Sequence, residues 1–376
     1  MKILIFTAST GGGHKRAAAA IKAKINELSP ETEVNIVDGM EAIDKVYNKT
    51  ITEGYHIMAT VIPEMYGKLY ELTDEKEPAA KAVIKGNEIR AKKLLETIYK
   101  YEPDIIIICH AFITNMVARL KKKGLLKTKA ISLITDYDAH RTYVSKDIDA
   151  FVLPDAGMAG KLHDEFEVPE EKIFPLGIPT FDCFIYNETR EELCRHERLD
   201  PTVPTVLLMA GSFGVTDVLE FYAQLAMSSD PLQLIVITGR NIRLFDQFDK
   251  TILKLHTEKK TKLLYFVDNV EDYMHIADVI VTKPGGLTVT ESIACNLPMA
   301  IYSAFPGQER YNAEFLVQRN AAVMIDKTNG AQVILDLLHD REKLSSMKES
   351  IKKLAHPNAA EDIFLLAKKM YEEDKA

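Results

Sequence analysis

The segment GGGHKRAAAA, residues 11–20, follows an apolar run and opens a helical pattern, so a glycine loop and a histidine meet where a helix begins. Glycine loops between a strand and a helix commonly hold phosphate, because their backbone N–H groups and the helix dipole favour negative charge. A dinucleotide fingerprint needs a third glycine after Gly11 and Gly13, but Arg16 occupies that position. The pattern indicates an anion-binding loop, and His14 needs a further explanation.

A second set of loops lies in the C-terminal half. The stretch TKPGGLTVTE, 282–291, ends a strand-like run, turns at two glycines and enters a helix. The N–H groups of a helix's first turn suit a diphosphate, and the carboxylate of Glu291, one turn further, can accept two hydrogen bonds from a diol such as ribose. The next loop, PGQERYNAEF at 306–315, has polar side chains suited to sugar hydroxyls. The glycine pair alone is also typical of a simple turn, but several such loops together indicate a ligand site.

The elements that position these loops alternate along the chain. Short apolar runs rich in β-branched residues are followed by longer helical patterns, which predicts parallel sheets covered by helices. The strand candidates are 2–7, 34–37, 104–109, 130–135 and 150–153 in the first half, and 205–210, 232–238, 263–267, 278–282, 299–302 and 322–325 in the second. The predicted fold class is α/β, with two doubly wound, Rossmann-like domains facing a cleft. Such folds bind ligands at the carboxyl ends of their strands.

The composition excludes several classes of protein. The chain is 47% hydrophobic, yet no apolar run approaches the roughly 20 residues of a membrane span, and its start lacks the zones of a signal peptide. The four cysteines show no metal-ligand spacing, and Cys109 and Cys295 lie in the apolar contexts of buried thiols. The net charge of −8 argues against general nucleic-acid binding. We expect a cytoplasmic protein that binds no nucleic acid.

Four segments together carry a resemblance: GGGH at 11–14, MAGSFG at 209–214, TKPGGLTVTE and PGQERYNAEF. They resemble the glycosyltransferases that make monogalactosyl- and glucosyldiacylglycerol, a group related to the peptidoglycan enzyme that adds N-acetylglucosamine to a lipid-linked muramyl peptide. YEPDIIIICH at 101–110 and TDYDAH at 135–140 extend the resemblance over nearly the whole chain. The resemblance implies a GT-B fold, UDP-glucose or UDP-galactose as donor and diacylglycerol as acceptor. It also implies inversion at the anomeric carbon, with no metal or other cofactor.

The resemblance assigns roles to matching positions. Glu291 would bind the ribose, the turns would hold the diphosphate, and donated N–H groups with Arg240 would stabilise the leaving UDP in place of a metal. The residues expected at the donor are Gly211, Ser212, Arg240, Asn241, Val267, Lys283, Pro284, Gly285, Gly286, Glu291, Gln308, Glu309 and Asn312. Those expected at the acceptor are Gly12, Gly13, His14, His140 and Tyr143. The family often has tryptophan where Tyr143 stands, so we expect a weaker contact by an amphipathic ring.

Inversion by direct displacement needs a base, and His14 is the first candidate. The helix dipole disfavours an imidazolium at a helix start, and the ordinary histidine pKa of ~6.5 is already near neutrality. Asp136, after the strand 130–135, competes for the same role or orients an imidazole. The alternative is that His14 caps its loop or binds the acceptor without moving a proton. His110 also lies at a carboxyl edge, where a supporting role in the core is expected.

Charge is distributed unevenly along the chain. Residues 1–150 hold 23 Lys and Arg against 20 Asp and Glu, and the remainder holds 24 against 35. Basic clusters such as 121–123 are either solvated helix faces or a surface for anionic lipid headgroups. The segment 47–73, rich in Tyr, Met and Ile and interrupted by Pro63, either packs against the first domain or dips into a bilayer to collect diacylglycerol. We expect peripheral association with the inner face of the cell membrane.

The domain boundaries follow from the strand series. The segment 176–204 has prolines near both ends and no strand-like run. We expect an N-terminal acceptor and membrane-facing domain over 1–180, a linker over 181–204 and a UDP-sugar-binding domain over 205–355. In folds of the resembled family the last helix, here 356–376, crosses back to the first domain.

Three rival functions stay open. The runner-up is a GT-B transferase on another lipid-linked acceptor, such as a peptidoglycan precursor. A second rival is a UDP-sugar-binding sensor without turnover, against which His14 argues. The third is an NAD oxidoreductase, for which Asp38 at the end of the run VNIVD would serve as the ribose ligand. Glucose and galactose are epimers that would meet the same side chains, so the sequence leaves the donor sugar open.

Overall fold

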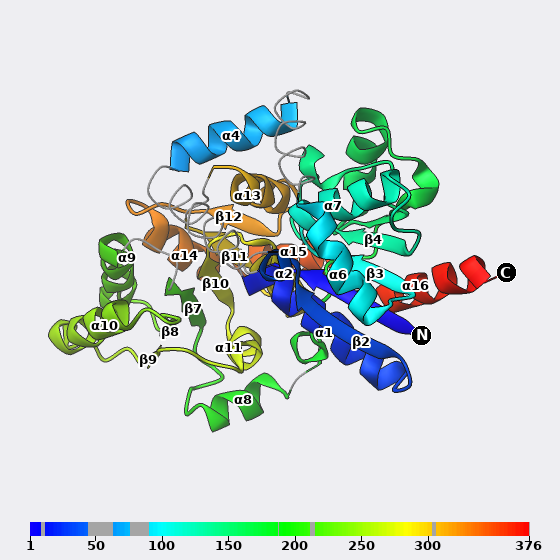
Figure 1. The fold of residues 1–376 in the computed structure, drawn as a ribbon. Coiled ribbons are helices and arrows are strands. Elements are labelled where there is room, and N and C mark those ends of the chain that lie inside the picture. The colour runs from blue at the N-terminus through cyan, green and yellow to red at the C-terminus, as the bar shows by residue number, and fades with distance from the viewer. Residues whose placement is uncertain are drawn as a thin grey trace.

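Each half of the chain forms a parallel sheet whose strands are buried on both faces. Strand β3 (Ile105–Ile108) consists of four completely buried isoleucines, the continuous apolar pattern of a strand covered by helices on both sides. This computed structural model describes residues 1–8, 12–43, 63–75, 90–186, 188–210, 215–302 and 306–375. Figure 1 shows the two halves as neighbouring lobes, one around β1–β4 and the other around β7–β12.

The first sheet has the strand order β2-β1-β3-β4-β5-β6, and all of its pairings are parallel. Its other strands are β1 (Lys2–Thr7), β2 (Glu33–Asp38), β4 (Lys129–Leu133), β5 (Ala150–Val152) and β6 (Ile173–Phe174). The longer helices of this half are α1 (Gly12–Leu28), α2 (Gly39–Ile43), α4 (Pro63–Glu75), α6 (Ala91–Tyr101) and α7 (Ala111–Lys122).

The second sheet has the order β12-β11-β10-β7-β8-β9 and is also parallel throughout. Its strands are β7 (Thr205–Met209), β8 (Gln233–Ile237), β9 (Thr261–Leu264), β10 (Val279–Thr282), β11 (Met299–Ile301) and β12 (Ala322–Met324). Its helices are α9 (Val215–Met227), α10 (Ile242–Leu255), α11 (Val270–Ile276), α12 (Gly286–Ala294), α13 (Gln308–Gln318), α14 (Gly330–His339) and α15 (Arg341–Leu354).

The strand order reverses direction once in each sheet. In the first sheet the reversal lies between β1 and β3, and in the second it lies between β7 and β10. Open α/β sheets bind ligands in the crevice outside the carboxyl ends of the strands at such a point. The loops that follow these four strands are therefore where a ligand site is expected, and they include the starts of α1, α7 and α12.

The last helix, α16 (Ala359–Lys375), belongs by its packing to the first lobe. Ile363, Phe364 and Ala367 lie in one hydrophobic cluster with Ile3 and Ile105 of the first sheet. Figure 1 shows this helix in red beside the N-terminal strands. The short helix α8 (Arg190–His196) lies in the chain between the two sheets and starts with a capping box.

The structure confirms the predicted fold class, because every predicted strand overlaps an observed one. It adds β6, which has only two residues, both half-buried, and so lacks the apolar run by which the others are recognised. Within the part of the chain that the structure describes, no helix combines the length and the apolar character needed to cross a membrane.

Candidate active site

His14 lies in the first turn of α1, at the carboxyl edge of the first sheet. Its Nδ1 forms a hydrogen bond with the hydroxyl of Thr135 at 3.1 Å, and its ring meets the His110 ring edge-on at a centroid distance of 5.0 Å. Burial lowers the pKa of His14 to about 4, although a hydrogen bond with the backbone of Cys109 raises it. The imidazole is therefore neutral at neutral pH, the state in which it can accept a proton.

His110 lies beside His14, at the end of β3, which is the neighbour of β1 in the first sheet. It caps α7, because its Nδ1 accepts a hydrogen bond from the backbone N–H of Phe112 at 3.2 Å. The side chain is buried, and burial together with the neighbouring His14 lowers its pKa well below the ordinary value. The neutral His110 ring therefore packs edge-on against the His14 ring.

The start of α12 lies against the first lobe without room for a side chain. A Cβ on Gly286 would stand 2.0 Å from the carbonyl oxygen of Thr135 and 3.1 Å from Oδ1 of Asp136. A Cβ on Gly13 would be 3.5 Å from the Cβ of Leu287, so the starts of α1 and α12 face each other. The first N–H groups of α12, which suit an anion, therefore lie beside the loop that carries Asp136.

Asp136 is tied to the second lobe through Asn312. The completely buried Asn312 donates from Nδ2 to Oδ1 of Asp136 at 3.1 Å and to the carbonyl of Pro284 at 2.9 Å. Its Oδ1 accepts from the backbone N–H of Tyr137 at 2.7 Å. Burial raises the pKa of Asp136 to about 6, the Asn312 hydrogen bond lowers it, and Glu309 raises it. This carboxyl group therefore titrates near neutral pH.

Lys283 and Glu309 are oppositely charged residues that interact electrostatically. Burial lowers the pKa of Lys283, and the nearby Glu309 carboxylate raises it. Glu309 lies in the first turn of α13 beside Gln308 and acts on both Lys283 and Asp136. The structure thus brings these two predicted donor residues close to Asp136, one of the candidate bases.

Glu291, the predicted ribose ligand, faces across the cleft. Its Oε1 lies 2.9 Å from Nη2 of Arg16 on α1. Its side chain is almost completely buried, and burial raises its pKa to about 7, while Arg16 lowers it. A partner from the opposite lobe was not predicted for this carboxylate.

Three further donor candidates follow strands β8 and β9 of the second sheet. The Arg240 guanidinium lies over the Phe266 ring, 4.7 Å from its centroid, and Asn241 caps α10 by accepting from Leu244 N at 3.1 Å. Val267 follows β9 and packs against the core of the second lobe. Gly211 and Ser212 lie outside the described residues. Direct contact of these residues with a donor stays a prediction.

The residues predicted to bind the acceptor differ in exposure: one is exposed to solvent, and two others pack within the protein. Gly12 is exposed, with open space around its α-carbon. His140 is buried, and its ring nitrogens form hydrogen bonds with the Thr142 hydroxyl at 2.7 Å and the carbonyl of Tyr70 at 3.0 Å. Tyr143 is half-buried and packs against the first hydrophobic core. The acceptor roles of these residues stay predictions.

Helix α4 contacts both lobes, and Figure 1 shows it near α13. Its Asp74 accepts from the Arg141 backbone N–H at 2.8 Å and from Lys161 at 2.9 Å, both in the first lobe. Its Glu71 lies 3.5 Å from Arg310 of the second lobe. Of the predicted membrane segment 47–73, the residues before 63 lie outside the described part.

Three elements of the site were not predicted from the sequence. They are Thr135 as the partner of His14, Arg16 as the partner of Glu291, and α4 as a helix that contacts both lobes. Thr135 and Arg16 lie one or two residues from recognised site residues, which was the available signal. The position of α4 depends on contacts between distant parts of the chain, for which local sequence carries no signal.

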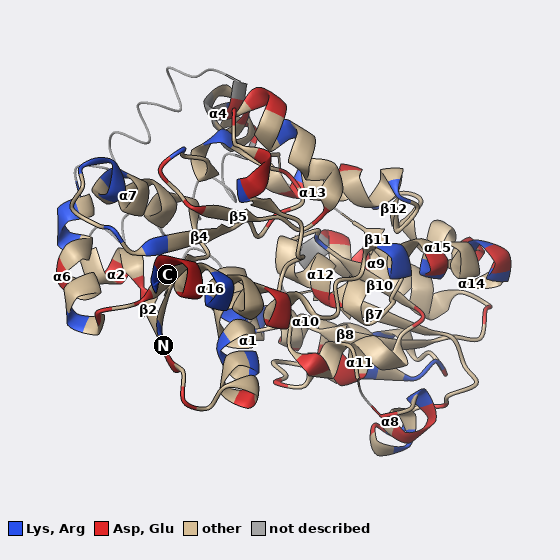
Figure 2. Cartoon of the chain, turned by 90° about the vertical axis from the view of Figure 1, so that its right-hand side faces the viewer, with Lys and Arg blue, Asp and Glu red and all other residues tan. Residues whose placement is uncertain are grey.

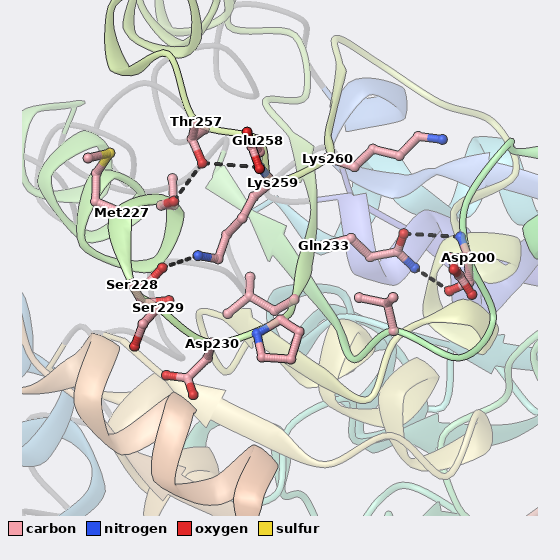
Figure 3. Close-up of a pocket in the computed structure, with 14 residues that line it drawn as sticks. Asp200, Met227, Ser228, Ser229, Asp230, Gln233, Thr257, Glu258, Lys259 and Lys260 are labelled. Carbon is pink, nitrogen blue, oxygen red and sulfur yellow. Dashed lines mark hydrogen bonds between the residues drawn. The ribbon is translucent and has the colours of Figure 1, made fainter.

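A cavity of about 540 Å³ lies at the opposite edge of the second sheet, and Figure 3 shows its lining. Gln233, the first residue of β8, exchanges hydrogen bonds there with the backbone of Asp200, and Lys259 donates to the carbonyl of Ser228. This is the amino edge of the strands, whereas ligands of such sheets bind at the carboxyl edge. The cavity is therefore not the candidate site.

Among the described residues, no group of three or more His, Cys, Asp or Glu is arranged to hold a metal ion. The cysteines within this part of the chain are free thiols, and burial raises the pKa of Cys109 to about 12. The expectation of a reaction without metal stays a prediction.

Two family models match the chain. Residues 14–180 match the monogalactosyldiacylglycerol (MGDG) synthase family, and residues 205–363 match the glycosyltransferase family 28 C-terminal domain. The chain is 26% identical over 363 residues to a processive diacylglycerol beta-glucosyltransferase of Bacillus pumilus, covering 96% of this chain and 93% of that protein. The enzyme of the same name from Bacillus subtilis is 25% identical, with the same coverage.

Solved structures share the fold. MurG from Acinetobacter baumannii superposes with a TM-score of 0.65 at 15% identity, covering 98% of this chain and all of that one. HepE from Anabaena, solved in complex with UDP-glucose, superposes with a TM-score of 0.55 at 14% identity, covering 100% of this chain and 99% of that one. The two family matches fall on the two lobes in turn and leave out only the chain between them and the two ends. The chain belongs to the glycolipid-forming GT-B glycosyltransferases, with an MGDG synthase lobe followed by a family 28 C-terminal lobe.

Proposed function

We propose that this protein transfers a hexose from UDP-hexose to the free hydroxyl of diacylglycerol, with inversion at the anomeric carbon. The supporting observation is the meeting of α12 and α1. The start of α12, in the lobe that matches family 28, lies against Thr135 and Asp136 of the MGDG synthase lobe, and the Thr135 hydroxyl forms a hydrogen bond with the neutral imidazole of His14. A nucleotide sugar and an alcohol bound on the two sides of this contact would meet there.

In this reaction the acceptor oxygen forms a bond to the anomeric carbon while the bond from that carbon to the UDP oxygen breaks. The acceptor proton passes to His14, whose burial keeps the imidazole neutral. The negative charge that develops on UDP is stabilised by the N–H groups of the first turn of α12 and by Lys283. Asp136 remains ionised above its raised pKa and accepts a hydrogen bond from the reacting sugar or acceptor.

Diacylglycerol is a membrane lipid, so the enzyme must meet a bilayer. Figure 2 shows Lys and Arg gathered on α6 and α7, at the side of the first lobe away from the second. Exposed basic residues on these helices and in the turn after α7 include Lys92, Lys122, Lys123 and Lys127. Two large apolar side chains are exposed beside them: Tyr99 of α6 is 63% exposed, and Leu125 in the turn after α7 is 41% exposed. We name these six residues the α6–α7 surface and propose that it contacts anionic headgroups.

One lysine of the predicted basic cluster has a different role. Lys121 lies 2.8 Å from Asp149 and donates to the carbonyl of Thr128 at 2.9 Å. Its side chain is largely buried, so it stabilises the lobe instead of contacting lipid. Of the basic cluster 121–123, the α6–α7 surface therefore includes Lys122 and Lys123 but not Lys121.

The function is tested with vesicles that contain diacylglycerol, supplied separately with UDP-glucose and UDP-galactose. We expect a hexosyldiacylglycerol, identified by mass, with a β-linkage by NMR when the α-linked donor is used. The runner-up is tested in parallel with a lipid-linked muramyl peptide and UDP-N-acetylglucosamine.

Two results would contradict the proposal. Product from the muramyl acceptor and none from diacylglycerol would assign the chain to the peptidoglycan reaction. Binding of UDP-hexose without product from any acceptor would make it a nucleotide-sugar sensor.

A further inference from the structure

Helices α1 and α12, which belong to different lobes, contact each other along more than one turn. Near their starts, a Cβ on Gly13 would contact the Cβ of Leu287 at 3.5 Å. One turn further, Nη2 of Arg16 lies 2.9 Å from Oε1 of Glu291. The helix that carries the candidate base thus also reaches the residue expected at the ribose.

Besides its ion pair with Glu291, Arg16 contacts an aromatic ring. Its guanidinium carbon lies 5.5 Å from the centroid of the Phe184 ring, in the segment between the lobes. The side chain is 42% exposed, whereas that of Glu291 is 7% exposed. The Nε of Arg16 is buried and has no hydrogen-bond partner among the described residues. The guanidinium therefore contacts the carboxylate through Nη2, and its Nε–H group is a hydrogen-bond donor that this contact does not use.

We propose that Arg16 is a positioning residue for the donor, which pairs with Glu291 across the cleft and keeps this carboxylate ionised while it accepts the ribose hydroxyls of the UDP-sugar. An ionised carboxylate has about four acceptor positions, so a contact of Arg16 at Oε1 leaves Oε2 for the diol. The inference rests on the proposed function, because it takes Glu291 as the ribose ligand.

The surroundings of Glu291 explain why a cation is needed. Burial and the Glu271 carboxylate on α11 both favour the protonated carboxyl group, and Arg16 opposes them. Cys295, at the end of α12, also interacts electrostatically with Glu291, and it lies 3.7 Å from His275 of α11. Cys183, from the segment between the lobes, is a thiol whose pKa is raised to about 11, so it carries no charge near neutrality.

The other helices packed against α12 are apolar where they join its core. Helices α13 and α15 both contact α12, and Ala313, Ile351 and Leu354 belong to the same hydrophobic cluster. Arg16 is therefore the cation that acts on this carboxylate within the described part of the chain. A protonated carboxyl group would lose acceptor capacity toward a diol, so loss of Arg16 should weaken donor binding most where Glu291 becomes protonated.

The experiment measures the dissociation constant of UDP-glucose by calorimetry between pH 6.5 and 8.5, without acceptor. UDP-glucose is chosen because its fully esterified diphosphate keeps a constant charge in this range. The variants are Arg16→Gln, Arg16→Lys and the matched control Lys15→Gln, which removes the same charge one residue earlier. Lys15 lies 3.6 Å from Asp38 of β2 and is half-exposed.

If loss of the cation raises the Glu291 pKa by one unit, Arg16→Gln binds UDP-glucose about five-fold more weakly than wild type at pH 7. At pH 8.5 the difference falls below about two-fold, because the carboxyl group is again ionised. Arg16→Lys keeps the charge and should restore most of the affinity at pH 7. Lys15→Gln should bind as wild type does at both values. Unchanged circular dichroism and thermal unfolding would establish that Arg16→Gln is folded.

A loss of affinity in Arg16→Gln that is equal at pH 7 and pH 8.5 would overturn the inference, since Arg16 would then contact the nucleotide itself. Unchanged affinity at pH 7 would also overturn it. Glu291→Gln separates the inference from the proposed function, because this variant should bind weakly and without pH dependence. If Glu291→Gln binds as wild type does, the ribose assignment fails. Absence of any hexosyl product from wild type would instead contradict the proposed function and leave the binding measurements standing.

Discussion

The side-chain amide of Asn312 donates a hydrogen bond to the carboxylate of Asp136 over 3.1 Å, so one buried residue of the second lobe holds a candidate base of the first. The same amide also bonds to Tyr137 and Pro284. Closure of the two lobes and ionisation of Asp136 are thereby coupled, since a hydrogen bond to a carboxylate favours its charged form.

Replacement of Asn312 by alanine should therefore have two effects. It leaves buried polar groups unpaired, which lowers the free energy of unfolding by about 1–3 kcal/mol in urea titrations. It also removes the bond that lowers the Asp136 pKa, so the acidic limb of the kcat profile should move to higher pH. Asn329→Ala, at an exposed asparagine whose side chain makes no capping bond, should change the unfolding energy by less than ~0.5 kcal/mol. Equal stability of both variants would contradict the coupling.

Gly286→Ala tests whether the contact between α12 and the first lobe exists in solution. The added methyl group would lie 2.0 Å from the Thr135 carbonyl oxygen, so the lobes must separate. We expect a larger radius of gyration by small-angle scattering, and a stability loss of about 1–3 kcal/mol. Gly285→Ala is the matched control for the scattering measurement, because a Cβ there meets no atom within 4 Å. Identical scattering curves for the two donor-free variants would argue against the closed arrangement.

His14→Ala should leave UDP-hexose affinity within ~0.5 kcal/mol, because the donor-binding lobe is on the other side of the cleft. Turnover should fall by roughly 10²–10⁴-fold, the contribution of a positioned general base. His14→Gln keeps a hydrogen-bonding group but cannot take the proton, so it should be nearly as slow as His14→Ala. Substantial activity in His14→Gln would leave His14 with a role in acceptor binding alone.

The pH profile of kcat separates the two candidate bases. The pKa of His14 is lowered to about 4 and that of Asp136 is raised to about 6. Activity that needs ionised Asp136 is complete well above pH 6 and falls as the pH drops through this value, while His14 stays neutral. Asp136→Asn should therefore remove the limb near pH 6 and keep measurable turnover. If Asp136→Asn is inactive while His14→Gln turns over, Asp136 takes the proton.

The α6–α7 surface predicts how the protein meets anionic vesicles. Exchange of Lys122, Lys123 and Lys127 for glutamate should reduce sedimentation with such vesicles, more at low salt than at high salt, because each basic residue contributes ~1 kcal/mol. The control exchanges three exposed lysines of the second lobe, Lys327, Lys343 and Lys353, for glutamate. Both triple variants change the net charge equally, so an equal loss of binding would contradict a localised surface.

Much of the architecture follows from local sequence. The four isoleucines of β3 and the other apolar runs predicted the strands of both sheets, because strands buried on both faces must be apolar along their whole length. The glycine loops marked the positions near His14 and Gly286, since a backbone that approaches a ligand or another lobe closely has no space for a Cβ. The two-residue strand β6 had no such signal.

Only the tertiary structure decided which of these loops meet. The pairing of Arg16 with Glu291 and the bond from Asn312 to Asp136 arise at the contact between the lobes. The lowered pKa of His14 arises from its burial beside Thr135 and His110, which come from other strands of its own lobe. Sequence patterns report the local periodicity of burial, whereas these interactions join residues that lie far apart in the chain. Their strength depends on the desolvation that occurs when the two lobes come together, and this is a property of the folded arrangement alone.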